Sequence, residues 1–163
     1  MEEWDAYKED GSLAGFNLYR DEPVPAGLYH LVCEVLVKHT DGSYLLMQRD
    51  FKKKDYPGMF EATAGGSALK GETPVVAALR ELKEETGIEA DELIQIYHIL
   101  SHDVIYYGFL CITDCEKSSI ILQQGETISH IWLPEKDFLR FINTNEYIQA
   151  HKDRLAPYLR TIN

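Results

Sequence analysis

The chain has 163 residues, of which 45% are hydrophobic, and a formal net charge of −11 at pH 7. This length and apolar content suit one domain with its own core, so we expect a single domain over residues 1–163. The negative charge disfavours general nucleic-acid binding, which needs many Lys and Arg side chains on the phosphates. It does not exclude a small anionic substrate, because a bound divalent cation can reverse the field at a group of carboxylates.

No stretch of the sequence has the length and apolarity of a membrane span, and the opening residues lack the pattern of a signal peptide. The three cysteines, Cys33, Cys111 and Cys115, are odd in number and show no CxxC spacing. We therefore expect reduced thiols and a cytoplasmic protein that binds neither membranes nor nucleic acid.

The first segment, residues 1–26, is predicted to be an N-terminal arm or hairpin. Aromatic residues between Trp4 and Tyr19 flank the turn signal Glu9-Asp10-Gly11-Ser12. This segment could cover a site or form the contact of a homodimer, and both alternatives stay open.

A β-hairpin is predicted next, because two runs rich in β-formers flank the turn signal Asp41-Gly42. A basic loop and another short strand follow it and lead into Gly65-Gly66. The predicted strands are Tyr29 to His39, Tyr44 to Arg49 and Met59 to Thr63, and the loop is Phe51 to Gly58.

The clearest predicted helix begins after Thr73 and ends at Gly87. Thr73 suits the N-cap, Pro74 suits the first helical position, and Gly87 suits the left-handed position after the helix. At about 100° per residue, one apolar stripe forms on this helix. Its members are Val75, Ala78, Leu79 and Leu82.

The rest of the chain is predicted to hold a strand and two C-terminal helices. The strand is Ile128 to Leu133, and the helices lie within residues 135–160, over Lys136 to Ile142 and Glu146 to Leu159. Neither helix is basic enough to favour contact with DNA.

Three carboxylates, Glu81, Glu84 and Glu85, share one side of the first helix. Their spacing makes them neighbours that repel one another, and the last turn of a helix favours cations over anions. A divalent cation held by oxygen ligands would offset this repulsion. Such a run taken alone is more often a solvated helix face.

The run belongs to a longer pattern, GSALKGETPVVAALRELKEETGI, over residues 66–88. Nine defined positions recur at fixed spacing, and chance agreement is on the order of 10⁻⁸ at background residue frequencies. The segment resembles the Nudix box, G-x5-E-x7-R-E-U-x-E-E-x-G-U with U aliphatic, at every defined position. The resemblance implies an α/β fold (α+β in content), an α/β/α sandwich with a central mixed sheet.

The resemblance also implies a pyrophosphohydrolase that cleaves a phosphoanhydride bond in a small nucleoside diphosphate-linked or other diphosphate metabolite, with Mg²⁺ (or Mn²⁺) as cofactor. Glu81, Glu84 and Glu85 match metal-binding positions of the box, and Gly65 matches a position whose carbonyl often completes the metal shell. Either Glu81 or Glu84 could be the general base. Glu126 is a candidate ligand outside the box, with a surface loop charge as the equal alternative.

Supporting roles follow for four other residues. In the family, Arg80 and Glu72 hold the box in shape through an ion pair, and Arg80 also orients Glu81. Arg49 and Lys52 belong to the one basic concentration in this acidic chain and are candidates for binding distal phosphates.

Two other functions are considered. Residues upstream of the box, including Tyr29-His30 and Pro57-Gly58, resemble the relatives of isopentenyl-diphosphate isomerases, which use a catalytic cysteine after the Pro-Gly. Here the segment Met59 to Gly66 contains no cysteine and the box is intact. The second alternative is a nucleotide-sensing Nudix domain without catalysis, which the complete set of carboxylates disfavours.

Overall fold

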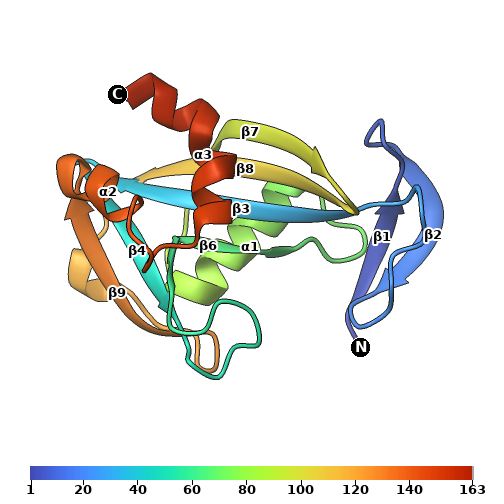
Figure 1. Cartoon of the computed structure of the whole chain (residues 1–163), viewed down its shortest axis with the longest axis horizontal. Coiled ribbons are helices and arrows are strands. Elements are labelled where there is room, and N and C mark those ends of the chain that lie inside the picture. The colour runs from blue at the N-terminus through green and yellow to red at the C-terminus, as the bar shows by residue number, and fades with distance from the viewer. Residues whose placement is uncertain (163) are drawn as a thin grey trace.

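A seven-stranded mixed sheet forms the centre of the computed structural model, which describes residues 1–162. Helix α1 covers one face of this sheet and helices α2 and α3 cover the other, while the β1–β2 hairpin stands beside it (Figure 1). The expected α/β/α sandwich with a central mixed sheet is confirmed. No helix within residues 1–162 is long and apolar enough to cross a membrane.

The elements have the following bounds. The strands are β1 Glu3–Tyr7, β2 Leu13–Tyr19, β3 His30–His39, β4 Ser43–Arg49, β5 Phe60–Ala62, β6 Ala64–Ser67, β7 Ile94–Ser101, β8 Val104–Thr113 and β9 Thr127–Pro134; the helices are α1 Pro74–Thr86, the 3₁₀ turn η1 Lys117–Ser119, α2 Glu135–Phe141 and α3 Gln149–Ile162.

Strand β3 is the centre of the sheet. It pairs in parallel with β8 over its whole length, from His30 opposite Val104 to His39 opposite Thr113. On its other side it pairs antiparallel with β6 in its first half and with β4 near its end. Strand β4 continues away from β3 and pairs with β5 and β9.

Thr63 marks the point where β3 and β4 diverge. Its buried hydroxyl accepts a hydrogen bond from the Val37 amide at 2.9 Å and donates one to the Leu45 carbonyl at 2.7 Å. The chain therefore leaves β4 after β5 and joins β3 as β6. The strand predicted from Met59 to Thr63 corresponds to β5, and a second strand with a different partner, β6, follows it and contains Gly65 and Gly66.

Helix α1 has the predicted ends. The Thr73 hydroxyl accepts from the Val76 amide at 3.3 Å, Pro74 occupies the first turn, and Gly87 has a left-handed φ of 79°. The predicted apolar stripe is partly wrong, because Val75 is 41% exposed. The buried face is rotated toward small residues that pack closely on β3 and β6, and its members are Ala77, Ala78, Leu82, Glu85 and Thr86.

Two predictions for the second half of the chain need correction. The last helix begins at Gln149 rather than Glu146, because the backbone before it pairs with Phe60: the Phe60 amide donates to the Glu146 carbonyl at 2.8 Å, and the Ile148 amide donates to the Phe60 carbonyl at 3.1 Å. The β7–β8 hairpin, residues 94–113, is a further part of the sheet that the sequence did not predict.

Candidate active site

Arg80 is the centre of the loop and helix made by residues 66–88. Its Nε donates to Glu72 Oε2 at 2.8 Å and its Nη2 to Glu72 Oε1 at 2.9 Å. Nη2 also lies 3.2 Å from the Ser67 carbonyl, and Glu72 Oε1 accepts from the Leu69 amide at 2.6 Å. The ion pair expected between Arg80 and Glu72 is present and ties the loop to the helix. Although burial raises the Glu72 pKa, the bonds from Arg80 hold it below its usual value.

Glu81 lies beneath β6, and a glycine makes room for it. A side-chain carbon at Gly66 would lie 2.5 Å from Glu81 Oε1, closer than such contacts allow. Arg80 Nη1 donates to the same oxygen at 2.8 Å and so orients the carboxylate. Burial raises the pKa of Glu81, since water is excluded from around its charge.

Glu85 is the most buried of the box carboxylates, with 7% of its surface exposed. Its Oε2 accepts a hydrogen bond from the Gly65 amide at 3.2 Å. Burial, and then the nearby charges of Glu61 and Glu81, raise its pKa well above the usual value. A negatively charged carboxylate this deeply buried destabilises the folded protein unless a cation binds it.

Glu84 and Glu126 lie toward solvent in the same cleft. Glu84 comes from α1 and forms an ion pair with Arg80 Nη1 at 3.2 Å. Glu126 comes from the loop before β9, and the Lys53 ammonium lies 2.5 Å from its Oε2. The structure thus brings Gly65, the three box glutamates and Glu126 together in one cleft of about 770 Å³, which we call the carboxylate cleft.

The carboxylate cleft fits a divalent cation by charge and by donor type, since its acidic groups offer only oxygen ligands. Within residues 1–162, however, no three His, Cys, Asp or Glu side chains are already grouped closely enough to hold an ion. Two basic side chains bind these carboxylates, since Arg80 pairs with Glu81 and Glu84, and Lys53 pairs with Glu126.

A basic wall borders the cleft on the side of the loop after β4. Arg49, Lys52, Lys53 and Lys54 all line it. Arg49 is held in place, because its Nε donates to the Asp55 carbonyl at 3.0 Å and its Nη1 lies 3.3 Å from Glu61 Oε2. Lys52 is exposed, and its side chain makes no hydrogen bond or ion pair to other residues in 1–162.

The N-terminal residues form a hairpin that supplies another wall of the cleft, which agrees with one of the two alternatives left open for this segment. Glu2, Trp4, Arg20 and Asp21 line the cleft. Backbone contacts fix the hairpin to the box loop, since the Lys70 amide donates to the Glu3 carbonyl at 2.9 Å. Trp4 also stacks on His30 with ring centroids 4.3 Å apart, so His30 packs against the hairpin and does not line the cleft.

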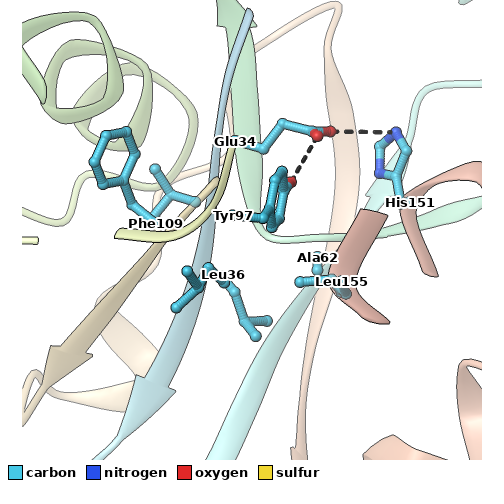
Figure 2. A pocket seen from close by; sticks show the side chains of 9 residues that line it. Glu34, Leu36, Ala62, Tyr97, Phe109, His151 and Leu155 are labelled. Atoms are coloured by element: carbon cyan, nitrogen blue, oxygen red, sulfur yellow. Dashed lines mark hydrogen bonds and ion pairs between the residues drawn. The ribbon is translucent and has the colours of Figure 1, made fainter. Parts of the chain in front are cut away.

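A buried network of charges lies on the α3 side of the sheet and was also missed. Glu34 of β3 accepts from the Tyr97 hydroxyl at 2.7 Å and from Arg154 Nε and Nη2 at 2.6 and 2.8 Å. Figure 2 shows Glu34 pointing between Tyr97 and His151, whose Nε2 lies 3.7 Å away. A lone carboxylate inside the apolar run Leu31 to Val37 was the signal that could have revealed it.

Comparisons with known proteins agree with this fold. A sequence model of the NUDIX domain matches residues 28–155. The Nudix hydrolase lmo0368 of Listeria monocytogenes is 42% identical over 151 residues, which cover 91% of this chain and 89% of the relative. The ADP-ribose pyrophosphatase of Bacillus subtilis is 28% identical and is matched over 96% of this chain and 84% of the relative.

Two further similarities concern part of the sequence and the fold. An isopentenyl-diphosphate Delta-isomerase of Corynebacterium diphtheriae is 34% identical over 71 residues, 44% of this chain and 39% of the relative. The crystal structure of DR0079 from Deinococcus radiodurans superposes with a TM-score of 0.77 at 18% identity, covering 96% of this chain and 99% of that one. Because the matched domain includes the whole segment 66–88 and most of this chain, the protein belongs to the Nudix family of hydrolases.

Proposed function

We propose that this Nudix pyrophosphohydrolase cleaves a phosphoanhydride bond in a small diphosphate metabolite with the help of Mg²⁺ or Mn²⁺. The observation that supports this most is the convergence of four glutamates in one cleft beside a basic wall. Glu81, Glu84, Glu85, Glu126 and the Gly65 carbonyl are the proposed ligands. Nudix hydrolases generally use divalent metals. When bound, such an ion offsets phosphate charge and makes a water molecule a better nucleophile.

The residues of the chain supply proton transfer and positioning. Either Glu81 or Glu84 would act as the general base, since both carboxylates line the cleft in which the water would lie. Arg80 and Glu72 hold the box in the shape that presents Glu81. Arg49 and Lys52 would bind phosphate oxygens at the basic wall.

A nucleoside diphosphate linked to a second group is the proposed substrate class. The relative named ADP-ribose pyrophosphatase is matched over nearly the whole chain, including the basic loop and the box.

The thiols of Cys33, Cys111 and Cys115 are free, in agreement with the proposed cytoplasmic location.

Isomerisation of a prenyl diphosphate is disfavoured by the position of the thiols. Cys33 and Cys111 are buried, burial raises the pKa of the Cys33 thiol to about 12, and no cysteine of residues 1–162 lines the carboxylate cleft. A catalytic thiol needs access and a lowered pKa. The complete set of box carboxylates also favours hydrolysis over sensing.

The test is a panel of nucleoside diphosphate sugars, dinucleotide polyphosphates, nucleoside triphosphates and prenyl diphosphates, incubated with Mg²⁺ and analysed by chromatography for nucleotide, sugar phosphate, phosphate and pyrophosphate products. We expect turnover of at least one compound and a loss of roughly 100-fold or more in Glu84→Gln. Glu89→Gln is the matched control, since Glu89 is exposed just after the box and forms an ion pair with Lys83. Equal rates in wild type and Glu84→Gln would refute the metal assignment.

A further inference from the structure

A β-turn over residues 69–72 precedes helix α1 and carries Glu72. The Glu72 amide donates to the Leu69 carbonyl at 3.0 Å, and Gly71 has a φ of 84°, as the third residue of a type II turn requires. Such a turn leaves the N–H groups of its two central residues without partners inside the turn. These two residues are Lys70 and Gly71, so their N–H groups must find partners elsewhere.

The N-terminal hairpin supplies both partners. The Lys70 amide donates to the Glu3 carbonyl at 2.9 Å, and the Gly71 amide donates to Asp5 Oδ2 at 2.7 Å. The Leu69 side chain packs against the separate apolar core of the hairpin. The hairpin stands beside the central sheet (Figure 1), before the residues 28–155 that match the NUDIX domain. An element outside that domain therefore binds a turn of the box.

The same turn is connected to the box carboxylates through Glu72. Its two oxygens accept from Arg80 Nε and Nη2 at 2.8 and 2.9 Å. Arg80 Nη1 in turn donates to Glu81 at 2.8 Å and to Glu84 at 3.2 Å. A continuous series of bonds therefore runs from Asp5, through the turn and Arg80, to two of the proposed metal ligands.

The bond to Asp5 matters because packing does not hold Gly71 in place. Gly71 is exposed, and a side-chain carbon built on it would meet no atom within 4 Å. Glycine also has more backbone freedom than any other residue. A carboxylate forms a stronger hydrogen bond with an amide than a neutral acceptor does. Asp5 is therefore well suited to fix this peptide group and, with it, the orientation of Glu72.

We propose that Asp5 is a positioning residue of the active site, which holds the Gly71 amide so that Glu72 presents both oxygens to Arg80. Arg80 is then fixed in the orientation that directs Glu81 into the carboxylate cleft. The hairpin thus acts on the metal site as well as on stability. The inference rests on the proposed function in one respect, that Glu81 binds a cation, whereas the connection from Asp5 to Arg80 is independent of it.

The test compares three variants of the hairpin. Asp5→Ala removes the acceptor, and Asp5→Asn keeps an oxygen acceptor without the charge. Asp10→Ala is the matched control, because the Asp10 carboxylate accepts from the Ser12 amide at 2.9 Å in the turn of the same hairpin. Two quantities are measured: the dissociation constant of Mg²⁺ by titration calorimetry, and the NMR resonance of the Arg80 Nε–H group in metal-free protein, assigned with Arg80→Lys.

Asp5→Ala is expected to raise the dissociation constant of Mg²⁺ roughly 3- to 10-fold, as the loss of one hydrogen bond implies, and to shift the Arg80 resonance. Asp5→Asn should recover most of both effects, and Asp10→Ala should match wild type. In a Glu72→Ala background, Asp5→Ala should weaken Mg²⁺ binding no further, because the connection to Arg80 is already broken.

An Asp5→Ala protein with a lower thermal midpoint but the Arg80 resonance and Mg²⁺ affinity of wild type would overturn the proposal, because the hairpin would then only stabilise the fold. A loss of Mg²⁺ affinity that is as large in the Glu72→Ala background as in wild type would overturn it too. If wild type binds no Mg²⁺, the proposed function fails separately. The Arg80 resonance then decides, with a shift in Asp5→Ala supporting the role of Asp5 and an unchanged resonance refuting it.

Discussion

The acidic residues of this site occupy positions that local helix physics disfavours. Glu81 and Glu85 are largely buried, and their pKa values are raised because water is excluded around them. Arg80 binds Glu81 on one side, and the Gly65 amide binds Glu85 on the other. The site therefore disfavours the ionised carboxylates when no cation is bound, and a bound cation would reverse this effect.

Gly66→Ala tests the close approach of β6 to Glu81. The added carbon would lie 2.5 Å from a Glu81 oxygen, whereas at Gly65 it would meet the Cys33 carbonyl of the backbone at 2.9 Å. We expect Gly66→Ala to remain folded, because the Glu81 side chain can move away from the added carbon. We expect this movement of Glu81 to lower the affinity for Mg²⁺. Gly65→Ala should instead lower the thermal midpoint. Titration with Mg²⁺ and thermal unfolding of both variants measure these two effects. An unchanged Mg²⁺ affinity in Gly66→Ala would contradict the prediction.

His151 predicts a pH dependence of stability in metal-free protein. Its pKa is lowered to about 4 by burial, with Glu34 raising it and Arg154 and Arg49 lowering it further. Between about pH 6.5 and 4 the unfolded chain binds a proton that the folded chain does not, so the free energy of unfolding falls as pH decreases. His151→Asn should remove this loss, at most about 3 kcal/mol.

Urea unfolding of wild type and His151→Asn from pH 4.5 to 7.5 measures this difference. The variant must be compared with wild type because the ionisation of Glu61, whose Oε2 lies 4.0 Å from His151 Nδ1, changes the free energy of unfolding with pH in the opposite direction. Burial raises the Glu61 pKa to about 7, so its ionisation destabilises the fold as pH rises. Stability curves that run parallel for the two proteins would disprove the contribution of His151.

At the scale of elements, the buried pair of Glu34 and Arg154 fastens α3 to the sheet. It crosses from β3 to a helix 120 residues later in the chain, and its two side chains are mostly buried. A pair of this kind adds little over an apolar contact, but breaking it leaves an uncompensated buried charge. This contact fixes α3 in the position that places His151 and Arg154 next to Glu34, in the wall of one pocket.

Arg154→Met is expected to lower the free energy of unfolding by about 3 to 5 kcal/mol, because Glu34 then lacks its partner. Arg140→Met is the control, since Arg140 is exposed and lies 3.8 Å from Asp137, and its loss should be below about 1 kcal/mol. Urea unfolding measures both. The double variant Glu34→Gln, Arg154→Met should recover part of the loss, and an Arg154→Met protein as stable as wild type would rule out this role for the pair.

For the whole molecule, a net charge of −11 affects both stability and metal binding. Self-repulsion destabilises a compact acidic chain, and any salt relieves some of it. A specific site adds a further effect, because a ligand that binds only the folded state stabilises it by about 2.7 kcal/mol at 100 times its Kd.

Mg²⁺ is therefore expected to raise the thermal midpoint by roughly 5 to 10 °C at saturating concentration, and chelation should reverse the change. NaCl at matched ionic strength separates screening from site binding. The shift should be much smaller in Glu84→Gln and unchanged in Glu89→Gln. An equal shift in NaCl and MgCl₂ would mean that no specific site is filled.

Local information in the sequence predicted the parts of the fold whose ends carry their own signals. Thr73, Pro74 and Gly87 define α1 because capping depends only on neighbouring backbone groups. Asp41-Gly42 defines the turn between β3 and β4 for the same reason. The resemblance of residues 66–88 to the Nudix box implied an ion pair between Glu72 and Arg80, and the structure contains it.

Tertiary structure alone decided the features that depend on pairing between distant segments. Strands β7 and β8 join the sheet through the parallel pairing of β3 with β8, which no local pattern reveals. The burial of Glu85, the contribution of the hairpin to the cleft and the contact of Glu34 with Arg154 arise in the same way. The sequence by itself determined the chemistry of residues 66–88, because that chemistry needs one loop and one helix. The walls around it come from the N-terminal hairpin, the end of β4 and the loop after it, β6 and the loop before β9, and only folding brings them together.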